Sequence, residues 1–258
     1  MPLSFCAVPL LARSHMSQVV VTIHGTGRTA QDFEVPQMQA LAAHLGTVPQ
    51  HRPVWWGDLI DAGACVSHNG EWLIARLHAL AQRFVGRPAR YTTRLVGHLA
   101  NGLHGWIDGV AGVVAYFVSA RQREVIRERL RAVLAELSRH NHEIILISES
   151  LGCLIAFDVL RTGAQHYNIA AWFTLGCPLW LLVRTGQRRA DLGAINRQTV
   201  GQWFNLYAPR DLVAAPMAPV FPAYPIRDER IDGAHGRLQA HRYWQHPRVA
   251  ALIARVLR

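Results

Sequence analysis

The chain of 258 residues contains no lysine, so all 27 of its basic residues are arginines. Against 17 acidic residues this gives a formal net charge of +10. The exclusive use of arginine indicates a GC-rich, bacterial genome as much as a chemical need. No basic run is interleaved with aromatic residues and no nucleic-acid-binding motif occurs, so we expect no nucleic-acid partner. The charge favours a solvated, arginine-rich surface, and peripheral contact with an anionic membrane stays open as an alternative.

Cysteine is also scarce, and the chain has only Cys6, Cys65, Cys153 and Cys177. These residues form no CxxC pair and no dense disulfide pattern, which favours reduced thiols in a cytoplasmic protein. Histidine is more frequent, with 14 residues, but the chain lacks an HExxH motif and any tight cluster of histidines with aspartates. We therefore expect neither a metal nor another cofactor.

Long uninterrupted apolar runs are missing as well. The longest apolar stretch, 96–120, contains histidines, an asparagine, an aspartate and several glycines, which argues against a membrane-spanning helix. No basic residue precedes the apolar start of the chain, so a secretory signal is not expected. We expect residues 1–16 to be a disordered or tag-like extension and residues 17–258 to form a single globular domain.

What the chain does contain is a regular alternation of strand-like and helix-like patterns. Short apolar runs, often β-branched, predict strands at 18–23, 52–56, 144–147, 170–175 and 202–207. Helix-like segments predict helices at 35–45, 71–85, 121–139, 151–161 and 247–257, and the segment 121–139 is the clearest because its apolar residues follow helical spacing. Strands that are apolar on both faces imply an α/β fold with a mostly parallel central sheet and helices on both faces. The span of about 57–120 is too long for a simple crossover and predicts an inserted helical cap.

The most informative stretch is SESLG at residues 148–152, which follows an apolar run and precedes a helical pattern. A nucleophile elbow has the pattern small-x-Ser-x-small between a strand and a helix, and its serine stands on a sharp turn. The first small position is usually glycine, and here it is Ser148. The pattern predicts Ser150 as the exposed nucleophile.

Other strand ends carry further residues of interest. In a parallel sheet, sites form beyond the carboxyl ends of the strands. A glycine-rich loop, HGTG at 24–27, follows the first predicted strand. Asp211 follows a later strand, and His241 precedes the last helix. The chain order Ser150, Asp211, His241 is the order expected of a serine, acid and histidine in this architecture.

In these motifs the chain resembles a serine hydrolase of the α/β-hydrolase superfamily, in its lipase/esterase-like branch. The resemblance covers essentially residues 17–258 and rests on VTIHGTG at 21–27, SESLG at 148–152, TLGCPL at 174–179, WFNLY at 203–207 leading to Asp211, and HRYW at 241–244. It implies an α/β-hydrolase fold without a cofactor. In that fold Ser150 would be the nucleophile, His241 its base and Asp211 the residue that orients the base. The backbone N–H groups of Leu151 and Thr26 would form the oxyanion hole.

Several of these assignments have rivals that the residues alone do not exclude. Asp228 or Asp232 could replace Asp211 as the acid, and His235 or His246 could replace His241 as the base. We interpret His24 as a structural residue that packs the oxyanion loop. Glu149 lies beside the nucleophile in sequence, where it could face the pocket and disfavour anionic substrates or could be solvated.

We expect the protein to cleave carboxylic esters, including lipid esters, through an acyl-serine intermediate. Its partner would be a small-molecule or lipid acyl substrate. A thioesterase or acyltransferase would use the same three residues, so these activities stay open. A non-catalytic binding module on a hydrolase scaffold is a further alternative, because fold does not imply function.

Overall fold

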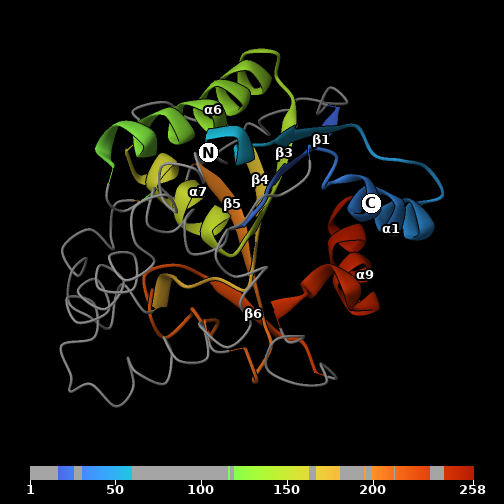
Figure 1. Cartoon of the computed structure of the whole chain (residues 1–258). Helices are drawn as coiled ribbons and strands as arrows, with labels where there is room; N and C mark the ends of the chain where they lie inside the picture. Colours follow the sequence, from blue (N-terminus) through green and yellow to red (C-terminus); the bar gives the residue numbers. More distant parts are fainter. Residues whose placement is uncertain are drawn as a thin grey trace, which may run out of the picture.

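The computed structural model describes residues 17–25, 31–59, 116, 119–162, 167–180, 195, 199–211, 213–232 and 241–258. Its centre is an all-parallel sheet of six strands in the order β2-β1-β3-β4-β5-β6 (Figure 1). The strands are β1 (Gln18–Ile23), β2 (His51–Val54), β3 (Glu143–Glu149), β4 (Ile169–Leu175), β5 (Val200–Tyr207) and β6 (Ile226–Arg230).

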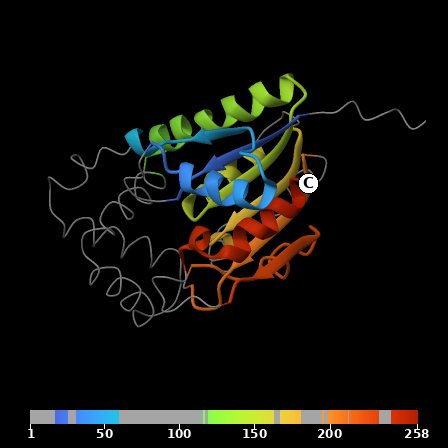
Figure 2. The same cartoon turned by 90° about the vertical axis from the view of Figure 1, so that its right-hand side faces the viewer.

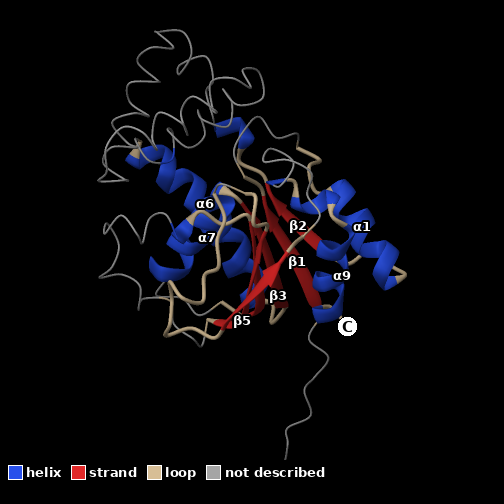
Figure 3. Ribbon diagram, turned by 90° about the horizontal axis from the view of Figure 1, so that it is seen from below, coloured by secondary structure: helices blue, strands red, loops and turns tan. Residues whose placement is uncertain are grey.

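Helices cover both faces of this sheet. The four longer ones are α1 (Val35–Leu45), α6 (Ala120–Arg139), α7 (Leu151–Thr162) and α9 (Pro247–Val256), and η1 (Gly57–Leu59) and η4 (Tyr243–Gln245) are short 3-10 turns. Figure 3 shows the sheet between α6 and α7 on one side and α1 and α9 on the other, and Figure 2 shows α1 and α9 in front of it. The predicted α/β fold, a parallel sheet with helices on both faces, is confirmed.

The two helical layers create two separate hydrophobic cores, because successive side chains of a strand point to opposite faces. In β3, Ile144 and Leu146 contribute to the core under α6 and α7, whereas Ile145 and Ile147 contribute to the core under α1 and α9. All four are buried. This double burial explains why β3 is a continuous apolar run in the sequence.

The helix ends follow from local sequence signals. Helix α1 has a proline in its first turn and is capped at its C-terminus by Gly46. The φ of Gly46 is 81°, which suits glycine, and its N–H donates to the carbonyl oxygen of Ala42. Helix α6 begins after Ser119, whose side chain accepts a hydrogen bond from the N–H of Gln122. Helix α9 begins after His246, which caps the N–H of Arg248. The helices predicted at 35–45, 121–139, 151–161 and 247–257 are therefore confirmed, within one residue at each end.

A buried polar cluster joins α6 to α7. The guanidinium of Arg127 pairs with the carboxylate of Asp158, and the hydroxyl of Tyr116 donates to the same carboxylate at 2.7 Å. A buried charge needs such partners, because isolated it would carry a large desolvation cost. The cluster fixes Tyr116 against both helices on the α6 and α7 side of the sheet.

The sequence-based prediction of the strands was incomplete, because it missed β6. This strand reads IRDER, so four of its five residues are charged, and an apolar pattern could not reveal it. Among the described strands it lies at the edge of the sheet and pairs with β5 alone. An edge position tolerates charged side chains, which also protect the edge from pairing with other chains.

Other predictions fall outside the described residues. These are the extension at 1–16, the helix at 71–85 and nearly all of the cap predicted at about 57–120, of which η1 and the start of α6 are described. None of the helices in the described part of the chain is both long and apolar enough to cross a membrane.

Candidate active site

Ser150 occupies the sharp turn between β3 and α7. Its φ of 53° lies in the left-handed region, which is uncommon for a residue with a side chain. The turn is fixed by two backbone hydrogen bonds: Ser150 N–H donates to Leu175 O at 2.9 Å, and Cys153 N–H donates to Ser150 O at 3.0 Å. The strand, turn and helix that the elbow pattern predicts are all formed around this serine.

Two glycines allow the end of β1 to pass close to this turn. A Cβ atom at Gly25 would lie 2.8 Å from the Cβ of Ser150. A Cβ atom at Gly152 would lie 2.7 Å from the carbonyl oxygens of both Ile23 and His24. Both distances are shorter than real Cβ contacts, so these positions require glycine, and they let His24 and Gly25 lie directly against the turn at Ser150.

The unusual Ser148 is accommodated by its own hydrogen bonds. Its hydroxyl accepts from the indole N–H of Trp172 at 2.8 Å and donates to Phe173 O at 3.2 Å. The side chain is fully buried, and its hydroxyl lies 3.5 Å from Cys153 Sγ of α7. A small hydroxyl with both functions satisfied can therefore stand where other elbows have glycine.

Asp211 and His241 form a hydrogen-bonded pair, with His241 Nδ1 2.8 Å from Asp211 Oδ2. Asp211 Oδ1 accepts the N–H of Val213 at 3.0 Å, and Oδ2 also accepts the hydroxyl of Tyr243 at 2.8 Å. Burial pushes the pKa of Asp211 up, but these partners outweigh it and hold the pKa below its usual range. Burial pulls the pKa of His241 down, but the hydrogen bond and charge of Asp211 and the charge of Glu149 raise it overall.

This pairing decides the protonation of the imidazole. A carboxylate can only accept hydrogen bonds, so Nδ1 of His241 carries the proton. The other ring nitrogen, Nε2, is then the acceptor in the neutral imidazole. That is the tautomer a general base needs.

The end of β4 brings the histidine and the serine to the same edge of the sheet. Gly176 has a φ of 63°, and a Cβ atom there would lie 2.7 Å from both His241 Cε1 and Tyr243 Cε2. The preceding residue, Leu175, accepts the N–H of Ser150. Leu175 and Gly176, which are consecutive in the chain, therefore contact the elbow and the imidazole, so Ser150 and His241 both lie beside the end of β4.

One of the two predicted oxyanion donors lies in the described residues. Leu151 is the first residue of α7, and the first N–H groups of a helix have no partner within the helix. They also lie at the positive end of the helix dipole, where they favour an anion. Thr26 lies outside the described residues, so its role stays a prediction.

The carboxylates of the rival acids are bonded to groups with structural roles. Asp228 accepts hydrogen bonds from Asn205 Nδ2 at 2.7 Å and from the N–H groups of Met217 and Ala218 at 2.8 and 2.9 Å. It therefore secures the loop that leads from Asp211 to β6. Asp232 is exposed and pairs with Arg230 at 2.8 Å.

Of the two rival bases, the structure describes only His246. His246 caps the start of α9, and its Nε2 lies 2.6 Å from Asp232 O, so both ring nitrogens have backbone partners. His235 lies outside the described residues.

His24 has the structural role that we inferred from the sequence. Its ring stacks on Trp56 at 4.7 Å, and its Nε2 accepts the N–H of Trp56 at 3.1 Å. Its Nδ1 is therefore the protonated nitrogen and donates to Gly25 O at 2.9 Å. Burial lowers the pKa of His24 to about 4. The residue stays neutral and fixes the end of β1 beside the elbow.

Glu149 is partly buried and electrostatically linked to His241. Alternation along β3 places it on the face opposite Ser148, which is the face of α1 and α9. Burial raises the pKa of Glu149, and the nearby His241 opposes that rise. Of the two sequence-based interpretations, full solvation does not describe this carboxylate, because it is partly buried and interacts with His241.

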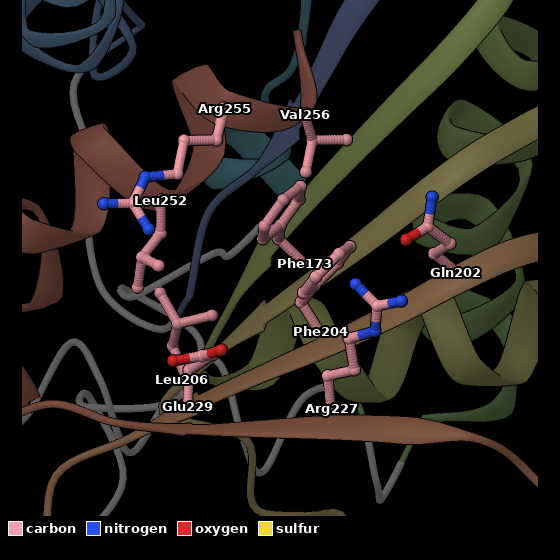
Figure 4. A pocket seen from close by; sticks show the side chains of 9 residues that line it. All are labelled: Phe173, Gln202, Phe204, Leu206, Arg227, Glu229, Leu252, Arg255 and Val256. Carbon is pink, nitrogen blue, oxygen red and sulfur yellow. The ribbon is translucent and has the colours of Figure 1, made fainter.

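A separate groove of about 450 Å³ lies between α9 and the last two strands (Figure 4). Its lining is Phe173, Gln202, Phe204, Leu206, Arg227, Glu229, Leu252, Arg255 and Val256. Figure 4 shows side chains of α9 on one side and of β6 on the other, with the stacked rings of Phe173 and Phe204 between them. No predicted catalytic residue lines it.

Within the described ranges, no group of three or more histidine, cysteine or acidic side chains is placed to hold a metal ion.

Two residues of the site were not identified from the sequence as site residues. Tyr243 and Gly176 stood only within the motifs HRYW and TLGCPL that carry the resemblance. Their roles depend on contacts with residues far away in the chain, which a motif does not reveal.

No protein-family model matches the chain, and no curated protein matches its sequence. Among solved structures, it is similar to a crystal structure of a candidate hydrolase of the α/β superfamily from Xanthomonas campestris pv. campestris. The two are 18% identical, the match covers 93% of this chain and 97% of the other, and the TM-score is 0.46.

Proposed function

We propose that the protein is a serine hydrolase that cleaves carboxylic esters, including lipid esters, through an acyl-serine intermediate. The observation that carries this proposal is the 2.8 Å hydrogen bond between Asp211 and His241, formed at the sheet edge where Ser150 stands on the elbow. A serine hydroxyl is a poor nucleophile until a base takes its proton. A histidine held in one tautomer by a buried acid is the base that this chemistry requires.

In the first half-reaction, Ser150 Oγ attacks the acyl carbon while its proton passes to His241 Nε2. The carbonyl oxygen becomes an oxyanion, which the N–H of Leu151 and an N–H of the loop after β1 stabilise. When the tetrahedral intermediate collapses, the bond to the leaving alcohol breaks and His241 returns the proton to the alcohol oxygen. The products are free alcohol and acylated Ser150.

In the second half-reaction, a water molecule takes the place of the alcohol. His241 Nε2 accepts a proton from the water, whose oxygen attacks the acyl carbon, and the same donors stabilise the second oxyanion. Collapse releases the carboxylic acid and returns the proton to Ser150. Throughout, Asp211 stays ionised, orients the imidazole and stabilises the imidazolium.

Hydrolysis of p-nitrophenyl esters of increasing acyl length tests the proposal. We expect measurable kcat/KM in the wild type and a loss of about a thousandfold or more in Ser150→Ala, because the nucleophile is removed. Ser138→Ala is the matched control: this serine lies at the far end of α6, where its hydroxyl accepts the N–H of Asn168. Ser150→Ala that retains near-wild-type activity would refute the nucleophile assignment.

A second arm with acyl thioesters defines the leaving group. The same residues can attack an ester or a thioester carbonyl, so relative kcat/KM for matched acyl groups decides between them. The proposal predicts a preference for the oxygen ester. A strong preference for the thioester would replace it with a thioesterase.

A further inference from the structure

We propose that Tyr243 is a positioning residue of the site: its hydroxyl holds the carboxylate of Asp211 in place for His241 and weakens the pull of that carboxylate on the imidazole proton. The inference rests on the proposed roles of Asp211 and His241. It goes beyond them by naming a third group that acts on the pair.

The contact geometry carries the inference. The Tyr243 hydroxyl donates to Asp211 Oδ2 at 2.8 Å, and this is the same oxygen that accepts the Nδ1 proton of His241 at 2.8 Å. The hydroxyl in turn accepts the N–H of Ala208 at 2.9 Å. With Val213 N–H on the other oxygen, the buried carboxylate has three donors and the tyrosine supplies one of them.

The local fold explains why this tyrosine is placed so well. It lies two residues after His241, at the start of η4, so one short segment delivers both the base and the extra donor. Its ring is only 1% exposed, and its edge contacts Gly176 beside the ring of His241. The bond from Ala208 ties this segment to the end of β5, the strand that leads into Asp211. The hydroxyl therefore links the carboxylate of Asp211 to the segment that carries His241 and to the end of β5.

The electrostatics give the tyrosine a stable role. Burial, and then the charge of Asp211, raise the pKa of Tyr243 far above its ordinary value, so the hydroxyl stays protonated and donates throughout the working pH range. A donor to a carboxylate stabilises its negative charge and makes it a weaker partner for a proton or a cation. Tyr243 thus limits the rise that Asp211 imposes on the pKa of His241.

The alternative is that Tyr243 is an ordinary core residue whose hydroxyl merely satisfies Ala208. The two views differ in a measurable way. Tyr243→Phe keeps the ring but removes the hydroxyl, leaving the charge of Asp211 less compensated. The imidazolium is then favoured, so His241 should titrate at higher pH. A purely structural role would lower stability without moving this titration.

The test is an NMR titration of the His241 imidazole in the full-length protein, assigned by comparison with His241→Asn. We expect the midpoint in Tyr243→Phe to lie above that of the wild type by about half a pH unit or more. Tyr167→Phe is the matched control, since this buried hydroxyl has no hydrogen-bond partner among the described residues. It should leave the midpoint unchanged. A midpoint that stays in place in Tyr243→Phe overturns the inference.

Site-specific 3-fluorotyrosine at position 243 gives an independent measurement if the phenylalanine variant does not fold. A more acidic phenol donates a stronger hydrogen bond, so the His241 midpoint should move down, and no movement or an upward one contradicts the inference. Neither titration needs turnover. A shifted midpoint in a protein without esterase activity would leave the inference standing and reject the proposed function, whereas activity with an unmoved midpoint would do the reverse.

Discussion

At the scale of single residues, the site depends on backbone conformations that few residues adopt. Ser150 holds a φ of 53°, and such a conformation costs a residue with a side chain roughly 1–3 kcal/mol. The packing around the elbow maintains it. Ser150, Asp211 and His241 could be proposed from the sequence, with rivals left open for the acid and the base, because each lies at a strand end or before a helix, in a known order. Tyr243 could not, since its partner Asp211 lies 32 residues away and only the fold brings them together.

Gly176→Ala tests whether the close approach to the imidazole matters for activity. The new Cβ would lie 2.7 Å from His241 Cε1, so the ring must move. We expect kcat/KM for ester hydrolysis to fall about tenfold or more, because a small misplacement of a catalytic group is costly.

Gly46→Ala is the matched control for that change. Gly46 also has a positive φ, of 81°, but a Cβ atom there would have no neighbour within 4 Å. It should lose stability by roughly 1 kcal/mol from backbone strain alone and keep its kcat/KM. Equal losses of activity in both variants would show that backbone strain, and not contact with His241, is responsible.

Glu149→Gln tests the electrostatic link between this carboxylate and His241. The base must be neutral to accept the serine proton, so activity falls as the pH drops through the pKa of His241. Glu149 contributes to the raised pKa of His241. Removing its charge lowers that pKa, and the acid limb of kcat/KM against pH should move to lower pH.

Glu143→Gln controls for the loss of a carboxylate from the same strand. Glu143 lies at the opposite end of β3 and accepts a hydrogen bond from Gln18 at 2.6 Å. Its pH profile should match the wild type. An acid limb that stays fixed in Glu149→Gln, or moves upward, would contradict the assigned link.

At the scale of elements, the helices could be predicted from the pattern of apolar residues, whereas the edge strand β6 could not. The buried faces of α1, α6 and α9 repeat with helical spacing, whereas α7, whose residues 151–160 are all buried, was expected because a helix follows the strand and turn of an elbow. Strand β6 was missed because its buried surface comes partly from charged side chains. The guanidinium of Arg227 lies over the ring of Phe204 at 5.4 Å, so an arginine covers the apolar ring there.

Asp228→Asn tests the structural role of β6. The carboxylate secures the loop between Asp211 and β6 through three hydrogen bonds. An amide cannot accept all three, and a buried N–H left without an acceptor costs about 1–3 kcal/mol. We expect a decrease of this size in the free energy of unfolding, measured by urea denaturation.

Asp232→Asn supplies the comparison. Its ion pair with Arg230 is solvent-exposed on both sides, so the change should stay within about 0.5 kcal/mol. If the two variants were equally stable, Asp228 would not secure the loop as described.

At the scale of the whole molecule, the architecture was the most predictable feature. Strands that are apolar on both faces and alternate with helices are typical of a parallel sheet buried between two helical layers. The choice of acid was not predictable in the same way. Asp211 and Asp232 follow late strands and Asp228 lies within one, and only the partners that the fold supplies distinguish them. The cap at about 57–120 stays a prediction.

The most direct test of the account is covalent labelling of the folded protein with a fluorophosphonate, followed by mass spectrometry of the peptides. The reagent reacts with a serine hydroxyl only when a neighbouring base activates it. We predict one adduct, on Ser150, that forms in the wild type and is largely lost in His241→Asn and after heat denaturation. No adduct at Ser150 in the folded wild type, or labelling at an undiminished rate in His241→Asn, would contradict the central claim.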